Sequence, residues 1–236
     1  MSLPLTRRFE VRYDVHTLIG DTMPCDAAPQ LLMLHGAGHS HRARFHAQRV
    51  HFWEHGISSV AFDFVGHGET GGELRSSSLL SRTEQACRVI EALQLSPPLS
   101  ILAASMGAYT AVTLLRHYAI DRLILVVPAM YTAEAYAVPF NRGFTEIIRR
   151  PNSWQQSDAW HLLAGYTGEL LVIAGENDAV IPPGVIRNIY EAAKLAKRRQ
   201  LYVIPGASHN AISDLRANDP AGLDHVLGLM TSMLRA

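Results

Sequence analysis

Short apolar runs alternate along the chain with longer segments in which apolar residues recur at helical spacing. Runs rich in Val, Ile and Leu are typical of strands buried in a parallel sheet, and the segments between them of helices that cover its faces. The predicted strands are Gln30–Leu34, Ile57–Phe62, Leu99–Ala104, Arg122–Val127, Glu169–Ala174 and Gln200–Ile204. The predicted helices are His46–His55, Ser78–Leu93, Ser105–Tyr118, Pro183–Ala193 and Pro220–Leu234. This alternation predicts an α/β fold with a mostly parallel sheet and helices on both faces.

The N-terminal part of the chain adds a different pattern. Phe9–Tyr13 and His16–Leu18 have the composition of two short strands and predict a hairpin ahead of the parallel strands. A chain of 236 residues is long enough to bury roughly 70–75% of the surface that its unfolded form would expose. We therefore expect residues 1–236 to fold as a single domain.

One long segment departs from the alternation. Between Val127 and Glu169 the chain runs for about 40 residues without a predicted strand. Segments of this length are usually functional, and this one leaves the strand edge at which open parallel sheets bind ligands. We expect residues 130–168 to form a cap or lid, with a short amphipathic helix around Phe144. The alternative is a surface excursion whose aromatic side chains pack down on the core. Those aromatic residues are Tyr131, Tyr136, Phe140, Phe144, Trp154, Trp160 and Tyr166.

Charge and composition argue against several kinds of partner. Acidic and basic residues number 21 each, which gives no electrostatic reason to bind nucleic acid or an anionic membrane. No run approaches the ~18 apolar residues of a transmembrane helix, and Met1–Asp14 lacks a signal-peptide core. Two cysteines, Cys25 and Cys87, make no disulfide framework, although one bridge is left open. We expect a cytoplasmic protein, either a monomer or a homodimer.

The junction between a predicted strand and a predicted helix at residues 102–108, Leu-Ala-Ala-Ser-Met-Gly-Ala, carries the strongest chemical signal. A turn this tight projects Ser105 away from the sheet. The residues two before and two after it must be small, because the two backbones approach closely. Ala103 and Gly107 meet that requirement. The pattern predicts a nucleophile elbow in which Ser105 attacks a carbonyl carbon.

A candidate base and a candidate acid follow two later strands. His209 lies in a loop just past the strand that ends at Ile204, and Asp178 follows the strand that ends at Ala174. Since the carboxyl ends of parallel strands meet at one edge of a sheet, we expect both side chains to lie near Ser105. Glu176 is the alternative acid.

Attack on a carbonyl creates an oxyanion, which needs preorganised hydrogen-bond donors. The strand Gln30–Leu34 runs directly into a glycine-rich turn at residues 35–39, His-Gly-Ala-Gly-His. We expect the backbone N–H groups of Ala37 and Met106 to form the oxyanion hole, with His39 at the mouth of the pocket. The alternative is that the turn is only a flexible connection.

Taken together, these segments resemble the α/β-hydrolases, and in particular small serine esterases such as carboxylesterases and feruloyl or cinnamoyl esterases. The segments that carry the resemblance are 35–38, 63–68, 103–107, 175–178 and 206–209. The resemblance implies a triad of Ser105, Asp178 and His209, which is the chain order of that fold. It also implies an oxyanion hole at Ala37 and Met106 and a cap at residues 130–168.

One position departs from the pattern of these enzymes. Ala103 stands where the elbow usually has its first glycine. Alanine is small enough to keep the turn, so the substitution does not change the predicted fold, but it makes the subfamily less specific.

The segment 66–71, Gly-His-Gly-Glu-Thr-Gly, matches the phosphate-binding pattern of dinucleotide sites. Such a site would need a helix that begins directly after the glycines and an acidic residue at the end of the next strand. Both are missing, so we expect Asp63 and His67 to shape a loop near the site instead.

The chain contains 12 histidines, which raises the question of a metal. His51 and His55 have the i, i+4 spacing of helical ligands but lack the glutamate of the H-E-x-x-H motif. We expect no metal and no cofactor.

These observations predict a serine hydrolase that cleaves a small-molecule carboxylic ester with an apolar or aryl acyl group. Candidate substrate-binding residues are His39, Tyr131, Tyr136 and Phe140. The same triad would also serve a thioesterase, an acyltransferase, an aminopeptidase or a C–C bond hydrolase. A ligand-binding protein that has kept the fold without turnover is the alternative outside the enzymes.

Overall fold

The computed structural model describes residues 4–25 and 31–235. Gln30, the first residue of one predicted strand, lies outside the described residues, as do the first three residues of the N-terminal segment.

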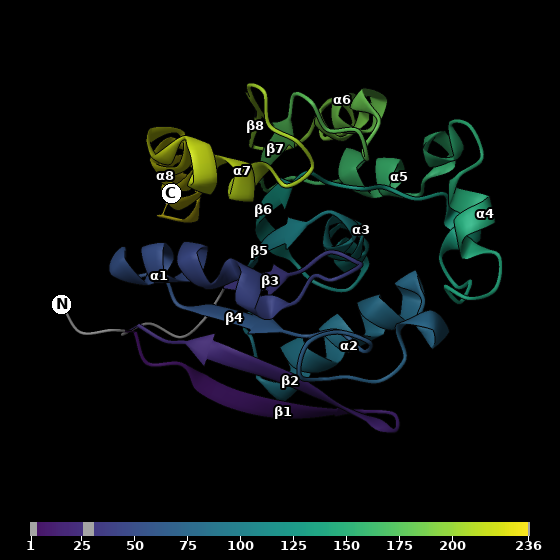
Figure 1. Ribbon diagram of the computed structural model, residues 1–236, viewed down its shortest axis with the longest axis horizontal. Helices are drawn as coiled ribbons and strands as arrows, with labels where there is room; N and C mark the ends of the chain where they lie inside the picture. The colour runs from purple at the N-terminus through teal and green to yellow at the C-terminus, as the bar shows by residue number, and fades with distance from the viewer. Residues whose placement is uncertain (1–3, 26–30, 236) are drawn as a thin grey trace.

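Eight strands of the described chain form one twisted sheet in the order β1-β2-β4-β3-β5-β6-β7-β8 (Figure 1). Neighbouring strands from β4 to β8 are parallel, whereas β2 is antiparallel to both β1 and β4. The strands are β1 Arg7–Tyr13, β2 His16–Met23, β3 Leu31–Leu34, β4 Ser59–Phe62, β5 Leu99–Ala104, β6 Ile120–Val126, β7 Glu169–Gly175 and β8 Arg198–Ile204. The predicted α/β class with a mostly parallel sheet is confirmed.

Helices cover both faces of this sheet. Helices α1, α7 and α8 pack on one face, and α2, α3, α5 and α6 on the other (Figure 1). The α-helices are α1 His46–Glu54, α2 Leu79–Ala92, α3 Met106–Thr113, α4 Phe144–Ile148, α5 Ala159–Ala164, α6 Pro183–Ala192, α7 Ala211–Asn218 and α8 Pro220–Arg235. The 3₁₀ turns are η1 Arg42–Phe45, η2 Leu74–Ser76, η3 Leu114–Arg116, η4 Ala133–Ala135 and η5 Ser153–Gln156.

The continuous apolar character of the central strands follows from this arrangement. Successive strand residues point to opposite faces, so Leu32 and Leu34 of β3 enter the core beneath α2 and α3, and Leu31 and Met33 enter the core beneath α1 and α8. A strand that is covered on both faces needs apolar residues at every position.

Most predicted elements are present within a few residues of their expected bounds, and the differences are local. The predicted strand His16–Leu18 extends to Met23 as β2, because its second half pairs with β4. The helix predicted over Ser105–Tyr118 ends at Thr113 and continues as the 3₁₀ turn η3. Helix α7 was not predicted.

The segment between β6 and β7 contains η4, α4, η5 and α5 and no strand of the described chain. Tyr131, Tyr136 and Phe140 of this segment pack against the core on the α3 face of the sheet. Its role as a cap remains a prediction.

None of the described helices is both long enough and apolar enough to cross a membrane. Cys25 and Cys87 are both free thiols.

Candidate active site

Ser105 occupies the sharp turn between β5 and α3. Its backbone has φ 51° and ψ −120°, which lies in a region that residues with a side chain rarely adopt. Hydrogen bonds hold it there, because its N–H donates to the carbonyl oxygen of Val126 at 3.0 Å and its own carbonyl accepts from Ala129 at 3.2 Å. The serine side chain is therefore fixed at the carboxyl edge of the sheet.

The neighbours of Ser105 must be small for the reason that the sequence suggested. A Cβ added to Gly107 would lie 2.4 Å from the carbonyl oxygen of Leu34, so the first turn of α3 passes directly over the end of β3. Ala103 is fully buried, and its methyl group is accommodated in the core. The alanine in place of the usual glycine thus leaves the elbow intact.

The structure brings His209 and Asp178 to Ser105. The Nε2 atom of His209 lies 3.0 Å from the Oγ atom of Ser105, and its Nδ1 atom lies 2.8 Å from Oδ2 of Asp178. The other carboxylate oxygen of Asp178 accepts hydrogen bonds from the backbone N–H groups of Val180 and Ile181, at 2.8 and 3.0 Å. The three side chains form a continuous hydrogen-bonded line drawn from the ends of three different strands.

Glu176, the alternative acid, has another partner. Its carboxylate accepts a hydrogen bond from the backbone N–H of Gly206 at 2.8 Å. Asn177 donates its backbone N–H to the carbonyl of Ala207 at 2.8 Å, so the loop after β7 and the loop before His209 are tied together. Glu176 stabilises the loop that carries the histidine and does not contact its imidazole ring.

Asp214 in α7 also holds the histidine loop, and sequence reasoning missed it. Its carboxylate accepts hydrogen bonds from the N–H and the hydroxyl of Ser208, at 2.8 and 2.7 Å. These bonds lower the pKa of Asp214 below its ordinary value. The signal was present as an acidic residue in the first turn of a helix directly after the histidine loop, but α7 itself had not been predicted.

The glycine-rich turn after β3 passes against the serine. A Cβ built on Gly36 would lie 3.1 Å from Cβ of Ser105. Among the described residues, the N–H groups of Ala37 and Met106 donate no hydrogen bond to the protein. Met106 is the first residue of α3, where backbone N–H groups have no partner within the helix and the helix dipole favours negative charge. Their role as an oxyanion hole beside Ser105 stays a prediction.

Behind this turn lies a fully buried arginine that sequence reasoning did not single out. The Nη2 atom of Arg82 donates to the carbonyl oxygens of His35 at 2.6 Å and Gly36 at 3.3 Å. Its guanidinium stacks over the ring of Phe64, 3.7 Å from the centroid, and its Nη1 atom lies 3.3 Å from Nε2 of His67. Within the described chain it has no carboxylate partner.

His35 is buried beside the same peptide group. Its Nδ1 atom lies 2.8 Å from the carbonyl oxygen of Gly36, and its Nε2 atom accepts the backbone N–H of Phe64 at 3.2 Å. The second bond places the proton on Nδ1, which therefore donates to Gly36. Burial lowers the pKa of His35 well below its ordinary value, so the ring is neutral at pH 7.

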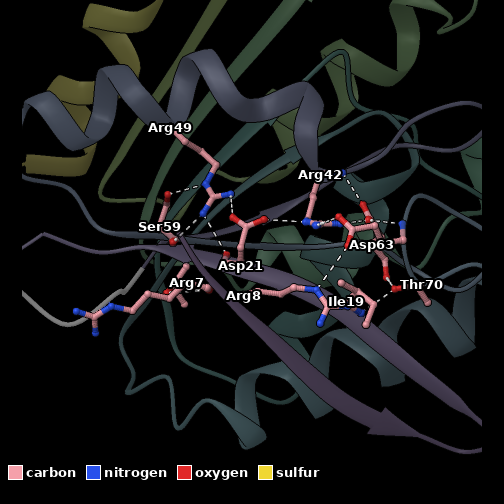
Figure 2. A network of polar contacts seen from close by, with 11 residues as sticks. Arg7, Arg8, Ile19, Asp21, Arg42, Arg49, Ser59, Asp63 and Thr70 are labelled. Atoms are coloured by element: carbon pink, nitrogen blue, oxygen red, sulfur yellow. Dashed lines mark hydrogen bonds and ion pairs between the residues drawn. The ribbon is translucent and has the colours of Figure 1, made fainter. Parts of the chain in front are cut away.

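A network of ion pairs fixes η1, the turn that follows the glycine-rich segment (Figure 2). Asp21 of β2 accepts from Arg42 of η1, with Nε 2.7 Å from Oδ2, and also pairs with Arg49 of α1. Asp63 accepts from the backbone N–H of Arg42 at 2.7 Å and from that of Glu69 at 3.0 Å. Asp63 therefore shapes the loop, as the sequence predicted.

The glycines of the segment 66–71 serve the same loop. A Cβ on Gly68 would lie 2.1 Å from the carboxylate of Asp63, and one on Gly66 would lie 2.3 Å from Cα of Leu74. Gly66 and Gly68 therefore make close contacts with Leu74 and Asp63 of the protein itself. Nor does the described chain gather three or more histidine, cysteine, aspartate or glutamate side chains that could hold a metal ion.

A cavity of about 350 Å³ opens beside Ser105 and His209. His39 lines it, together with Gly36 and Ala37. The other three candidate substrate-binding residues do not line it. Tyr131 and Tyr136 pack against Tyr109, with ring centroids 5.6 and 6.2 Å apart, and Phe140 packs against Phe144 at 4.7 Å. A role of these three in substrate binding stays a prediction.

Comparison with known proteins gives the family. Residues 26–158, more than half of the chain, match the serine aminopeptidase family S33. The chain belongs to this family and is a hydrolase of the α/β-hydrolase superfamily, as the sequence resemblance implied. The matched range includes Ser105, whereas Asp178 and His209 lie beyond it. A search of curated proteins found no match.

Solved structures of the same fold include several esterases. Est1E from Butyrivibrio proteoclasticus, solved with ferulic acid bound, is 17% identical, with 97% of this chain and 100% of that chain covered and a TM-score of 0.73. The esterase EaEST from Exiguobacterium antarcticum is 18% identical, with coverages of 93% and 98% and a TM-score of 0.69. A thioesterase domain from the curacin biosynthetic pathway is 16% identical, with coverages of 94% and 99% and a TM-score of 0.67. At these identities the likeness is one of fold.

Proposed function

We propose that this protein is a serine esterase that hydrolyses a small-molecule carboxylic ester through an acyl-enzyme intermediate. The observation that carries the proposal is the hydrogen-bonded line from Ser105 through His209 to Asp178, at 3.0 and 2.8 Å. The proposal is supported by the N–H groups of Ala37 and Met106, which have no partner in the described part of the chain, and by a cavity of about 350 Å³ lined by Ser105.

In the acylation step, Nε2 of His209 takes the proton of Ser105 as its Oγ attacks the ester carbonyl. Asp178 accepts from Nδ1 of the same ring, which keeps Nε2 free to accept a proton and stabilises the imidazolium that forms. The N–H groups of Ala37 and Met106 donate to the oxyanion. The imidazolium then gives its proton to the leaving alcohol, and the acyl group remains on Ser105.

In the second step a water molecule takes the place of the alcohol. His209 removes a proton from the water as it attacks the acyl carbonyl, and the same two N–H groups stabilise the second oxyanion. Return of the proton to Ser105 releases the carboxylic acid. Every protein group in these two steps belongs to this chain, and water is the only other reactant besides the ester.

The central test is turnover of p-nitrophenyl esters of graded chain length and of methyl ferulate by the wild-type protein and by Ser105→Ala. We expect the substitution to lower kcat by roughly 10⁴- to 10⁶-fold. Ser76→Ala, at an exposed serine on the 3₁₀ turn η2, is the matched control and should retain full activity. Ester turnover at near wild-type rate by folded Ser105→Ala protein would refute the assignment.

Amide hydrolysis is the second candidate, because the matching family takes its description from serine aminopeptidases. The same triad cleaves amides when the leaving amine is protonated by the histidine. Amino acid p-nitroanilides and a thioester of the same acyl group, assayed beside the esters, separate the candidates. A higher kcat/KM for the anilides than for the matched esters would favour the aminopeptidase.

A further inference from the structure

The cavity beside Ser105 is lined by buried side chains, which we call its floor, and by two exposed arginines, which we call its rim. The floor includes the apolar residues Phe45, Leu102 and Met230 and one polar residue, Gln48. Arg44 of η1 and Arg216 of α7 line the same cavity with exposed side chains. No aspartate or glutamate of the described chain lines it.

The two rim arginines differ from the other arginines near the site in their side-chain contacts. Among the described residues neither Arg44 nor Arg216 forms an ion pair or a side-chain hydrogen bond. The nearby Arg42 and Arg49 differ in this respect, because both bind the carboxylate of Asp21. The guanidinium groups at the rim are therefore free to bind an anion that arrives with the substrate.

Resting on the proposed esterase function, we propose that the substrate is a monoester of a dicarboxylic acid. Its apolar spacer would lie on the floor of the cavity, its ester carbonyl beside Ser105, and its free carboxylate at Arg44 and Arg216. Arginine is suited to this task because its planar fork can donate two hydrogen bonds to one carboxylate. Ligand sites commonly combine an apolar lining with a few polar groups that fix orientation.

The test compares monoethyl adipate with diethyl adipate, which differ in the free carboxylate but share the acyl chain. The measured quantity is the ratio of kcat/KM for the monoester to that for the diester. For the wild type we expect a ratio of about ten or more, falling about threefold in Arg44→Gln or Arg216→Gln and about tenfold in the double variant. Raised salt should lower the wild-type ratio by screening the carboxylate.

Arg187→Gln is the matched control, because Arg187 is exposed on α6 and does not line the cavity. Its ratio should equal that of the wild type. A wild-type ratio at or below one, or a ratio that survives in the double variant, overturns the carboxylate subsite while leaving the esterase intact. If the protein hydrolyses neither adipate ester and no p-nitrophenyl ester, both the esterase and the carboxylate subsite are overturned.

A second observation stands independently of the cavity. Arg82 is fully buried, carries no ion-pair partner in the described chain, and has an Nε atom without a hydrogen-bond acceptor. A buried charge without a counter-ion costs stability. Burial lowers the pKa of Arg82 to about 9, which still leaves the guanidinium charged at neutral pH. Because this buried charge lowers stability, a purely structural role does not explain it.

Arg82 donates to two successive carbonyl oxygens of the turn, that of His35 at 2.6 Å and that of Gly36 at 3.3 Å. The carbonyl of Gly36 also accepts from Nδ1 of His35, and it belongs to the same planar peptide group as the N–H of Ala37. We infer that Arg82 is a positioning residue for the oxyanion hole. With its carbonyl held by two donors on one side, the peptide group presents its N–H on the other side, and the positive charge polarises it toward a developing oxyanion.

Arg82→Met and Arg82→Lys test this role, with thermal unfolding as the check on folding. We expect kcat for an ester to fall about 100-fold in Arg82→Met with KM changed less than threefold, because the oxyanion exists only in the transition state. The affinity of a trifluoromethyl ketone, which forms a tetrahedral oxyanion on Ser105, should fall in parallel with kcat. Arg82→Lys retains a charged donor and should recover part of the loss.

A merely structural role would change the unfolding temperature without this split between kcat and KM. If Arg82→Met does not fold, Arg82→Gln, which removes the charge, carries the test. A folded Arg82→Met or Arg82→Gln protein with wild-type kcat and wild-type affinity for the ketone would overturn the inference.

Discussion

At the residue scale, the two candidate acids after β7, Glu176 and Asp178, make different contacts although they are only two positions apart. Asp178 reaches the imidazole of His209, whereas Glu176 reaches the backbone N–H of Gly206. Asp178→Asn would let the amide donate to Nδ1 and so stabilise the wrong tautomer, in which Nε2 carries the proton and cannot act as a base.

We therefore expect Asp178→Asn to lower kcat for an ester by about 10⁴-fold at neutral pH. Glu176→Gln preserves the shape of the side chain and provides a comparison at the neighbouring position, with an expected loss below tenfold. Steady-state kinetics on one p-nitrophenyl ester measures both. A larger loss in Glu176→Gln than in Asp178→Asn would exchange their roles.

At the element scale, the strands of the central sheet were predictable because each is covered on both faces, which forces a continuous apolar run. The glycine at 107 was predictable for an equally local reason, since the turn after Ser105 leaves no room for a Cβ beside Leu34. The length of strand β2 was underestimated. Its second half, Gly20 to Met23, is specified by pairing with β4 and not by its own hydrophobic pattern.

Other features depend on contacts between distant segments, which no local pattern records. Helix α7 is short and half exposed, and its position depends on the hydrogen bonds that Ser208 donates to Asp214. Arg82 looks like a polar position on an amphipathic helix until the fold places it beneath the turn at His35. Tyr131, Tyr136 and Phe140 after β6 were predicted to bind substrate, and that role stays a prediction, because an aromatic run alone does not specify which face of a sheet it covers.

At the scale of the whole molecule, the sheet gathers segments that are far apart in the chain. The turn after β3, the elbow after β5 and the loops after β7 and β8 all lie at the carboxyl edge of parallel neighbours. The loops after β7 and β8 are further locked to each other, because a Cβ on Gly175 would lie 2.4 Å from the carbonyl oxygen of Ser208. Global folding therefore assembles the proposed triad.

The stability of the whole molecule should fall in mild acid, because two histidines are buried beside Arg82. Burial and the nearby guanidinium lower the pKa of His67 to about 4, and in the unfolded chain it titrates near 6.5. Between these values the unfolded chain binds a proton that the folded chain does not. This contribution to stability is complete above pH 6.5 and is lost as the pH falls toward 4.

Urea unfolding between pH 4 and pH 8 measures this effect when wild type and His67→Gln are compared. We expect the free energy of unfolding of the wild type to fall more steeply below pH 6.5 than that of the variant. The difference in slope should correspond to the uptake of at most one additional proton on unfolding. The two proteins differ only at residue 67, and His35 is the neighbour whose lowered pKa depends in part on that residue. The difference between the two curves therefore reports His67 together with its effect on His35. Parallel curves across this range would show that His67 titrates alike in the folded and unfolded chains.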